Sequence, residues 1–483
     1  MVVVDRQMVP SGLYIAGKER PASDSSTFDV LDPSDGSVVV AVANGTARDA
    51  RACVDAAAEA AGAWAALAPR KRAEILRRSF ELMTARSDEI ATLIVRENGK
   101  PLADARSETA YAAEFFRWYS EEAVRNSGEL MTAPSGANRI IVLRGPVGIC
   151  VLVTPWNFPA AMATRKIGPA LAAGCTCILK PASDTPLTAL LIATILEEAG
   201  VPAGVVNVLP SRRSGEVVAA MVDDPRVRKL SFTGSTEVGR SLLEVAARTV
   251  TNTSMELGGN APFLVFADAD LDAAVEGAMI AKMRNMGEAC TAANRFYVEE
   301  PVAQEFSRLL SERMKSLRIG NGLEQGIQVG PLINEAARDK IDELLSDAVE
   351  RGAEIVTGGH RPERPGYFFE PTVVEGVVPG SKILSEEIFG PVAPLVTFTD
   401  ESDAIAMAND TDYGLVSYLY TGDLSRGLRV SEALEAGMIG LNRGIVSDPA
   451  APFGGVKQSG IGREGGHEGM LDYTESKYVA TNW

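Results

Sequence analysis

The sequence predicts an α/β protein with parallel, doubly wound sheets. From residue 140 onward, apolar runs typical of buried strands alternate with helical segments. The runs "ICVLVTPW", "CTCILKP", "GVVNVLP" and "VRKLSFTG" begin at residues 149, 175, 204 and 227, and these onsets are separated by about the length of a βαβ unit. Before them, residues 46–125 carry apolar side chains every three to four positions, which indicates helices. This pattern favours a parallel sheet with helices on both faces.

A second αβ region is predicted from about residue 257 to residue 440. Its expected strands are "APFLVF", "RFYVEE", "APLVTFT" and "VSYLYT". The tail "SKYVATNW" predicts a final strand with little to pair with inside its own domain. A terminal apolar strand of this kind is often a subunit contact, so we expect a homodimer or homotetramer.

Composition excludes several classes of partner. With 483 residues the chain is long enough for two or three domains. Its net charge of −17 disfavours nucleic acid and anionic membranes, which both need a basic face. No apolar run reaches the roughly 18 residues of a membrane helix, and the start does not resemble a signal peptide.

Five sparse cysteines argue against a disulfide framework and favour a reducing cytoplasm. Cys175 and Cys177 form a C-x-C pair, but no second Cys/His pair lies nearby in the sequence. We therefore interpret them as small buried residues on a strand and expect no metal site.

Cys290, in "NMGEACTAANRF", is the candidate nucleophile. A thiol reacts as the thiolate, so it needs a low pKa or a base within reach. The two histidines, His360 and His467, lie in glycine-rich segments and are more typical of surface residues. A carboxylate is the remaining base, and Glu256 in "SMELGGN" is the best candidate, because burial can raise its pKa into a useful range.

The stretch "LSFTGSTEVGR" predicts a phosphate site where a strand runs into a helix. Ser235 and Thr236 are suitable helix caps, and the N-terminus of the helix favours an anion. The glycine pattern is not G-x-G-x-x-G, so the motif alone is weak. Glu256 follows Gly234 by 22 residues, where a ribose-binding acid is also possible, but its Gly-Gly flank favours the catalytic interpretation.

Two further polar residues end predicted strands. Asn157, in "LVTPWNFPAAM", is held between prolines, and its amide can donate to an oxyanion, although the local sequence alone favours a turn-stabilising role. Lys180, in "CILKPAS", stands where ligands bind on such sheets, and the alternative is a solvated surface lysine.

Together these segments resemble the aldehyde dehydrogenase superfamily, and the resemblance covers nearly the whole chain. The motifs that carry it are "PWNFP" (155–159), "LKPAS" (179–183), "FTGSTEVG" (232–239), "MELGGN" (255–260), "GEACTAANR" (287–295), "EEIFGPV" (386–392) and "PFGGVKQSGIGRE" (452–464). Their order and spacing also match. Within the superfamily, the chain most resembles the succinate-semialdehyde dehydrogenases.

The resemblance implies a fold and a reaction. It implies a dinucleotide-binding domain (1–125 and 146–256), a catalytic domain (257–445) and a small β oligomerisation arm (126–145 and 465–483). In the reaction, Cys290 attacks an aldehyde, Asn157 and the Cys290 N–H hold the oxyanion, and Glu256 activates water to hydrolyse a thioester. The positions that the resemblance assigns to the nicotinamide cofactor are Thr154, Pro155, Trp156, Lys180, Ser183, Gly234, Ser235, Leu257, Glu387 and Phe389.

The resemblance also implies a substrate with a distal carboxylate, bound by Arg165, Arg284 and Ser447. Two guanidiniums and a hydroxyl can hold a carboxylate through charge-assisted hydrogen bonds and supply a local positive field. Internal ion pairs are the alternative role for both arginines. Succinate semialdehyde fits best, with glutarate semialdehyde or another ω-carboxy aldehyde as the alternative, since one methylene is worth only about 1–3 kcal/mol of discrimination.

Three positions bear on the chemistry and the cofactor. The family usually has Gln where Glu288 stands, and a carboxylate there can raise the thiol pKa or alter water access. Many relatives carry a second cysteine where this chain has Ala292, so no local disulfide switch is expected. Many NAD-dependent relatives have Glu three residues after the lysine; Ser183 stands there instead, so we expect NADP, with NAD usable.

Two other functions use the same residues. A non-redox thiol esterase or acyl-transfer enzyme would share the Cys290 thioester but reduce no cofactor. A catalytically silent relative would be indifferent to loss of Cys290. The presence of Cys290, Glu256 and Asn157 together argues against the silent relative.

Overall fold

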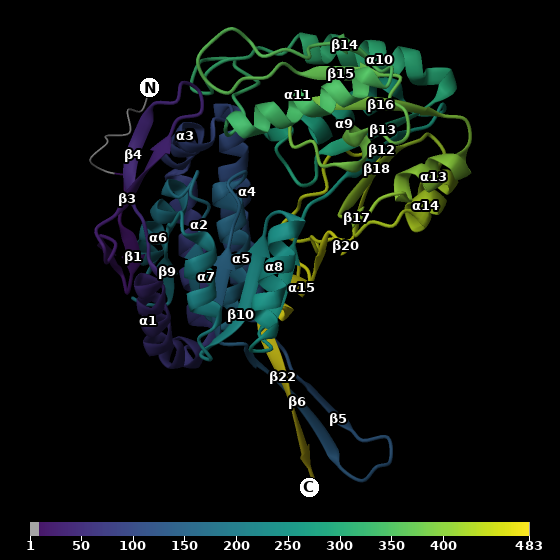
Figure 1. Ribbon diagram of the computed structural model, residues 1–483. Helices are drawn as coiled ribbons and strands as arrows, with labels where there is room; N and C mark the ends of the chain where they lie inside the picture. Colours follow the sequence, from purple (N-terminus) through teal and green to yellow (C-terminus); the bar gives the residue numbers. More distant parts are fainter. Residues whose placement is uncertain (1–8, 483) are drawn as a thin grey trace.

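The first of two large sheets confirms the doubly wound architecture (Figure 1). The computed structural model describes residues 9–482. In spatial order the strands are β2 (Lys18–Arg20), β1 (Leu13–Ile15), β9 (Val206–Val208), β8 (Thr176–Lys180), β7 (Ile149–Val153), β10 (Val227–Thr233), β11 (Asn252–Glu256) and β21 (Gly460–Ile461). The run from β9 to β11 is parallel, and the direction of winding reverses between β7 and β10. Ligands bind at such a reversal in doubly wound folds.

Helices cover both faces of this sheet because its central strands are apolar on both sides. All residues of β7 and β8 are buried, as expected for a parallel sheet between two helical layers. One face packs into a core with α2–α6, and the opposite face into a core with α1, α7 and α8. The helices are α1 (Ala47–Ala66), α2 (Pro69–Ala85), α3 (Ser87–Asn98), α4 (Leu102–Glu122), α5 (Pro159–Ala173), α6 (Leu187–Ala199), α7 (Ser214–Val222) and α8 (Thr236–Ala247).

The second sheet has its own core and lies above the first in Figure 1. Its strands, in order, are β14 (Glu354–Thr357), β15 (Thr372–Glu375), β16 (Val392–Phe398), β13 (Ala293–Glu299), β12 (Ala261–Val265), β18 (Val416–Tyr420) and β19 (Met438–Leu441). Its helices are α9 (Leu271–Met283), the short 3₁₀ helix η1 (Arg284–Gly287), α10 (Glu300–Lys315), α11 (Glu335–Glu350), α12 (Lys382–Ser385), α13 (Glu401–Asn409) and α14 (Leu424–Ala433). The four strands predicted for this region are confirmed.

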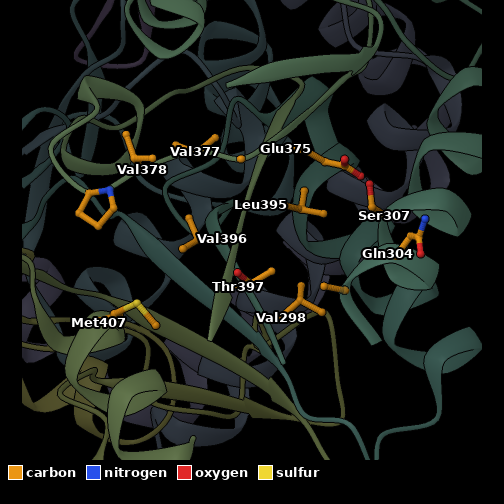
Figure 2. Close-up of a pocket in the computed structure, with 13 residues that line it drawn as sticks. Val298, Gln304, Ser307, Glu375, Val377, Val378, Leu395, Val396, Thr397 and Met407 are labelled. Carbon is orange, nitrogen blue, oxygen red and sulfur yellow. The ribbon is translucent and has the colours of Figure 1, made fainter. Parts of the chain in front are cut away.

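A cavity of about 520 Å³ opens between α10 and the β15–β16 side of the second sheet (Figure 2). Val298, Leu395 and Val396 line it together with Ser307 and Glu375. None of the residues predicted for catalysis or cofactor binding lines this cavity.

Three strands project from the body as an arm (Figure 1). They are β5 (Glu129–Thr132), β6 (Arg139–Pro146) and β22 (Thr474–Thr481). The sequence predicted the last strand but not its partner, which is β6, antiparallel along the whole length of β22. Apolar side chains of the arm stand in solvent: Leu130, Met131, Leu143, Tyr478 and Val479.

Short elements complete the structure. They are the hairpin of β3 (Thr27–Leu31) and β4 (Val38–Ala43), the pair β17 (Tyr413–Gly414) and β20 (Val456–Lys457), and α15 (Glu468–Leu471). Within residues 9–482, no helix combines the length and the apolar character that crossing a bilayer requires.

Candidate active site

A cavity of about 250 Å³ lies at the winding reversal of the first sheet, where it meets the second. It is lined by Pro155, Trp156, Asn157, Met162, Thr233, Gly234, Ser235, Leu257, Gly258, Cys290, Lys340, Glu387 and Phe389. The loops that follow β7 and β10 supply one wall, and Cys290 and Glu387 come from the catalytic half of the chain. Residues predicted from widely separated motifs therefore meet in one cavity.

Cys290 stands in the turn between η1 and β13, partly exposed toward the cavity. The Tyr418 hydroxyl donates to the carbonyl of Thr291 at 2.9 Å and so anchors the turn. Gly259 approaches the Cys290 carbonyl so closely that a Cβ there would lie 2.5 Å from its oxygen. The second glycine of "MELGGN" is thus required by the nucleophile segment packed against it.

The Cys290 thiol is protonated at neutral pH in the free protein. Desolvation raises the pKa of Cys290 to about 12, the positive charges of Arg165 and Arg284 oppose the rise, and the charges of Glu387 and Glu256 add to it. Neither histidine lines the cavity, and His467 Nδ1 lies 2.7 Å from Glu122 instead. A carboxylate therefore remains the candidate acceptor for the thiol proton.

Glu256 is the last residue of β11, beside Thr233 in the register of β10. Its side chain is 3% exposed, and neither carboxyl oxygen has a hydrogen-bond partner among the described residues. A Cβ on Gly454 would lie 2.9 Å from Glu256 Oε1, so the glycine leaves room for the carboxyl group. Burial, and next the charge of Glu464, raise the pKa of Glu256 well above its usual value. Glu256 does not line the cavity itself, but its charge contributes to the raised pKa of Cys290.

The Asn157 amide points to the nucleophile segment. Its Nδ2 donates to the Glu288 carbonyl at 3.1 Å, two residues before Cys290. The backbone around it is held by a buried ion pair: Lys100 Nζ donates to the Asn157 carbonyl at 2.7 Å and contacts Glu108 Oε2 at 2.5 Å. Asn157 is therefore more than a turn residue, because its side chain joins the β7 loop to the Cys290 turn.

Glu288 is fully buried and serves the backbone rather than the thiol. Its Oε1 accepts the Ile333 N–H at 3.0 Å. Burial raises the pKa of Glu288 well above its usual value, and the hydrogen bond from Ile333 and the charge of Lys100 oppose the rise. The shift favours the neutral form of the carboxyl group, which lessens like-charge repulsion of a Cys290 thiolate.

The cofactor-side residues are arranged for a dinucleotide. Ser235 caps α8 and accepts the Val238 N–H at 3.4 Å, so the N-terminus of α8 faces the cavity. Next to it, the Thr233 hydroxyl is buried without a hydrogen-bond partner among the described residues. The N-terminus of α8, which favours anions, and the unpaired Thr233 hydroxyl beside it together fit a pyrophosphate.

Aromatic and acidic groups also line the cavity. Trp156 and Phe389 meet edge to face with ring centroids 5.4 Å apart. Glu387 Oε1 accepts the Gly259 N–H at 3.3 Å, and burial raises the pKa of Glu387 to about 7. A carboxyl group of this kind fits the hydroxyls of a ribose.

Lys180 and Ser183 lie outside this cavity, at the end of β8. Lys180 pairs with Val153 in the β7–β8 register, and the Thr154 N–H donates to the Lys180 carbonyl at 3.2 Å. Burial lowers the pKa of Lys180 to about 8, so the ammonium is still mostly charged at pH 7. The alternative of a solvated surface lysine is wrong, because the side chain is 4% exposed.

The two predicted substrate arginines differ in their partners. Arg284 Nη1 lies 3.3 Å from Ser447 Oγ, and its guanidinium stacks on Phe158 at 4.8 Å. Among the described residues, no carboxylate lies within 4 Å of the Arg284 guanidinium. Arg165, in contrast, is fully buried, and its Nε contacts Glu464 Oε2 at 2.6 Å. The internal ion pair is therefore found for Arg165 and not for Arg284.

Sequence reasoning did not assign Met162, Thr233 or Gly258, which line the cavity, and it missed two charged residues at the site. Glu464 ends the quoted "GIGRE" motif and contacts both Arg165 and Lys166, and its position in that motif was the available signal. Lys340 lines the cavity from α11, and its charge favours the ionised form of Glu387. No motif marks Lys340, because on an amphipathic helix it is indistinguishable from any exposed lysine.

Known proteins resemble the chain over its whole length. A succinate-semialdehyde dehydrogenase of Paenarthrobacter nicotinovorans is 58% identical over 92% of this chain and 98% of its own. A glutarate-semialdehyde dehydrogenase of Pseudomonas putida is 48% identical over 99% of both chains. The crystal structure of an E. coli NADP-dependent enzyme superposes with a TM-score of 0.98 at 49% identity, covering both chains fully.

The family-level comparison agrees with the site. The profile of the Aldehyde dehydrogenase family matches residues 20–479. With a cysteine, a buried glutamate and an asparagine amide meeting beside a dinucleotide cavity, the chain belongs to the aldehyde dehydrogenase family.

Proposed function

We propose that this aldehyde dehydrogenase oxidises succinate semialdehyde to succinate and prefers NADP⁺. The observation that carries the substrate is the Arg284–Ser447 pair, a half-buried guanidinium and hydroxyl 3.3 Å apart with no carboxylate at the arginine among the described residues. A guanidinium without an internal anion is a site for a substrate anion. The names of the relatives, which act on four- and five-carbon semialdehydes, support the same class of substrate.

Arg165 has a different role in this proposal. Its Nε is already paired with Glu464, and the negative charge of Glu464 offsets part of the positive field of the Arg165 guanidinium. It still favours the charged form of Cys290. Arg284 and Ser447 therefore bind the distal carboxylate, and Arg165 supports the thiolate and the field around it.

The proposed catalytic steps use three residues. Cys290 Sγ bonds to the aldehyde carbon as its proton passes to a base, and the Asn157 amide and the Cys290 N–H stabilise the oxyanion. NADP⁺ bound by the residues of this cavity would supply the acceptor for the hydride that leaves that carbon, and Cys290 would then hold the carbon as a thioester. Glu256 then takes a proton from water as the water attacks the thioester, and the carbon–sulfur bond breaks to release succinate.

The raised pKa of Glu256 matches this role. A carboxyl group whose pKa is raised by burial holds a proton more strongly, so as a carboxylate it is a stronger base than an exposed glutamate. Because Cys290 also has a raised pKa, the free enzyme keeps the sulfur as a weakly reactive thiol. Formation of the reactive Cys290 thiolate then requires a base at the site to accept the thiol proton.

The NADP preference rests on the neutral Ser183 beside Lys180. Three residues after the lysine, a hydroxyl leaves space for a 2′-phosphate that a carboxylate would repel. The Leu209 N–H donates to the Leu179 carbonyl at 2.8 Å, so the segment after β9 lies beside the end of β8.

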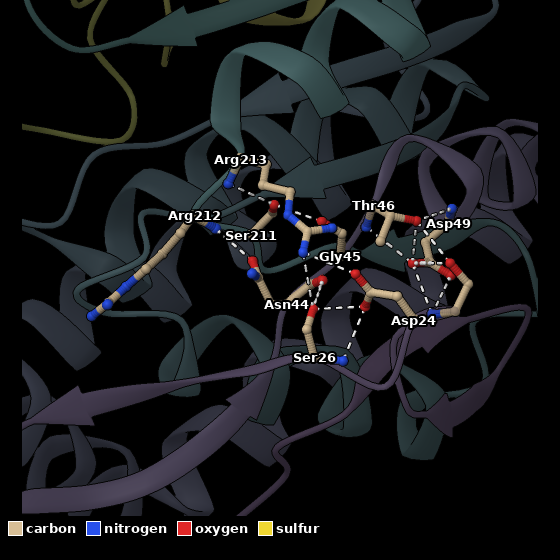
Figure 3. A network of polar contacts seen from close by, with 10 residues as sticks. Asp24, Ser26, Asn44, Gly45, Thr46, Asp49, Ser211, Arg212 and Arg213 are labelled. Carbon is tan, nitrogen blue, oxygen red and sulfur yellow. Dashed lines mark hydrogen bonds and ion pairs between the residues drawn. The ribbon is translucent and has the colours of Figure 1, made fainter.

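Arg212 adds positive charge to this region. Figure 3 shows Arg213 turned into a network with Asp24 and Ser26, while the Arg212 side chain extends away from it. Burial raises the pKa of Asp184, and the charges of Arg212 and Lys180 oppose that rise. Arg212 and Lys180 therefore act on the same region of the surface, where a phosphate would be stabilised.

For the organisation of the chain, we propose the division into a cofactor domain (1–125 and 146–256), a catalytic domain (257–445) and an oligomerisation arm (126–145 and 465–483). The exposed apolar side chains of the arm, with Leu130 at 64% and Tyr478 at 59%, support burial against a second copy. All five cysteines are free thiols, which is consistent with a cytoplasmic enzyme.

The substrate proposal is tested with aldehydes of equal length, with and without a terminal carboxylate, followed at 340 nm. We expect Arg284→Ala to raise KM for succinate semialdehyde about 10- to 100-fold, because a hydrogen bond to a charged group is worth about 1.5–3 kcal/mol. KM for butanal should change less than about threefold.

Equal losses on both aldehydes would refute the carboxylate-binding role of Arg284. Glutarate semialdehyde in the same panel distinguishes the five-carbon alternative. Ester cleavage without any increase in absorbance at 340 nm, for every aldehyde and both cofactors, would favour the non-redox thiol enzyme.

The pH dependence of Cys290 alkylation tests the raised thiol pKa. Below its pKa the thiolate fraction grows tenfold per pH unit, so the iodoacetamide rate of the free enzyme should rise about tenfold per unit from pH 7 to pH 9. The other four cysteines are buried, and Cys290→Ser serves as the control for their reactivity. A rate that levels off within this range would mean that the pKa is depressed.

Ser183→Glu tests the cofactor preference. The new carboxylate should repel the 2′-phosphate and lower kcat/KM for NADP⁺ at least tenfold, while kcat/KM for NAD⁺ stays within about threefold. Measuring both cofactors with one preparation controls for loss of active enzyme. A variant with an unchanged NADP⁺ to NAD⁺ ratio would rule out Ser183 as the selecting position.

The arm is tested by light scattering. Wild-type protein should have the mass of a dimer or tetramer, and Leu130→Arg should shift it toward the monomer, because a buried unpaired charge opposes association. Val250→Arg, at a residue 90% exposed outside the arm, is the matched control. A monomeric wild-type protein would contradict the proposal.

A further inference from the structure

Lys282 is a fully buried lysine that the proposed mechanism does not use. It lies in the last turn of α9 with no exposed surface. Its Nζ donates to Asn294 Oδ1 at 3.0 Å and to the Gly390 carbonyl at 3.2 Å. The comparable buried lysines Lys100 and Lys166 each contact a buried glutamate, whereas Lys282 contacts only neutral oxygens.

An unpaired buried ammonium is costly, so its presence calls for an explanation beyond packing. Taking an ammonium from water into a protein interior costs several kcal/mol unless an anion compensates it. Burial accordingly lowers the pKa of Lys282 to about 7, and the charge of Glu387 partly opposes the shift. An apolar residue of the same length would stabilise the fold at least as well.

The two acceptors of Lys282 belong to the two segments that form the active-site cavity. Asn294 is four residues after Cys290, in β13. Gly390 directly follows Phe389 and comes three residues after Glu387, both of which line the cavity. The segments touch at this point, since a Cβ on Gly287 would lie 2.2 Å from the Gly390 oxygen.

Both segments also contain strained backbone. Asn285 and Met286 have φ values of 52° and 53°, and Phe389 has a φ of 52°. A left-handed conformation at a residue other than glycine costs about 1–3 kcal/mol and persists only where the surroundings hold it. The Lys282 ammonium donates a hydrogen bond to each of the two segments and so helps to hold their backbone in place.

We propose that Lys282 is a positioning residue that fixes the Gly390 carbonyl against the nucleophile segment and thereby keeps Glu387 and Phe389 facing the cofactor. The inference rests on the proposed cofactor site. Lys282 itself touches neither the cofactor cavity nor Cys290. Its loss should therefore weaken cofactor binding before it affects the thiol.

The test compares two reactions of the purified full-length enzyme. Lys282→Met keeps the apolar length of the side chain but removes both donors. We expect KM for NADP⁺ to rise about tenfold, the equivalent of about 1.4 kcal/mol. Hydrolysis of p-nitrophenyl acetate without cofactor, which needs only the Cys290 nucleophile and water activation, should stay within about twofold.

Lys229→Met is the matched control. Lys229 is also fully buried, and its Nζ donates to an amide oxygen, that of Asn252, at 2.8 Å in the first sheet. This variant should leave the ratio of the two activities unchanged. Lys282→Gln, too short to reach the same carbonyl but able to satisfy Asn294, is the second variant if Lys282→Met does not fold, and it should show the same shift in KM.

An unchanged KM for NADP⁺, or an equal loss of ester hydrolysis, would overturn the positioning role. A wild-type enzyme that reduces NAD⁺ but not NADP⁺ would contradict the proposed cofactor preference instead. The comparison of Lys282→Met with Lys229→Met is then made with NAD⁺ and still decides the role of Lys282.

Discussion

The contacts of Glu464 with Arg165 and Lys166 are the interaction on which the active-site region depends. Glu464 comes from the C-terminal part of the chain, while the two cations follow the "PWNFP" loop on α5. All three side chains are almost completely buried, so each ion would be strongly destabilising without the others. The triad therefore joins the two distant segments, because neither Glu464 nor the two cations would be stable in the interior without the opposite charge.

The same triad sets the charges around the chemistry. The negative charge of Glu464 contributes to the raised pKa of Glu256, and the positive charge of Arg165 opposes the raised pKa of Cys290. Because the region is desolvated, these interactions are stronger than they would be in water. Arg165 also opposes the raised pKa of Glu256, so its charge favours the ionised form of both groups, whereas the charge of Glu464 disfavours the ionised form of Glu256.

Close approach at three glycines packs together the segments around the cavity. Gly259 lies against the Cys290 carbonyl, Gly287 against the Gly390 carbonyl, and Gly454 against the Glu256 carboxyl group. At each position even a methyl group would overlap a neighbouring atom. The glycine-rich motifs on both sides of the cavity are therefore explained by packing as well as by ligand binding.

The sequence by itself determined the elements and the main residues of the site. Continuous apolar runs predicted β7, β8, β9 and β10, and the motif around Cys290 marked a candidate nucleophile that lines the cavity, because both kinds of signal are local. Only the tertiary structure decided which charges are paired. It placed Glu464 on Arg165, left Arg284 with Ser447, made Glu288 a buried hydrogen-bond partner of Ile333, and buried Lys282 between two segments. Those outcomes depend on contacts between residues up to about 300 positions apart, and no periodicity or local motif encodes which distant group a buried charge will meet.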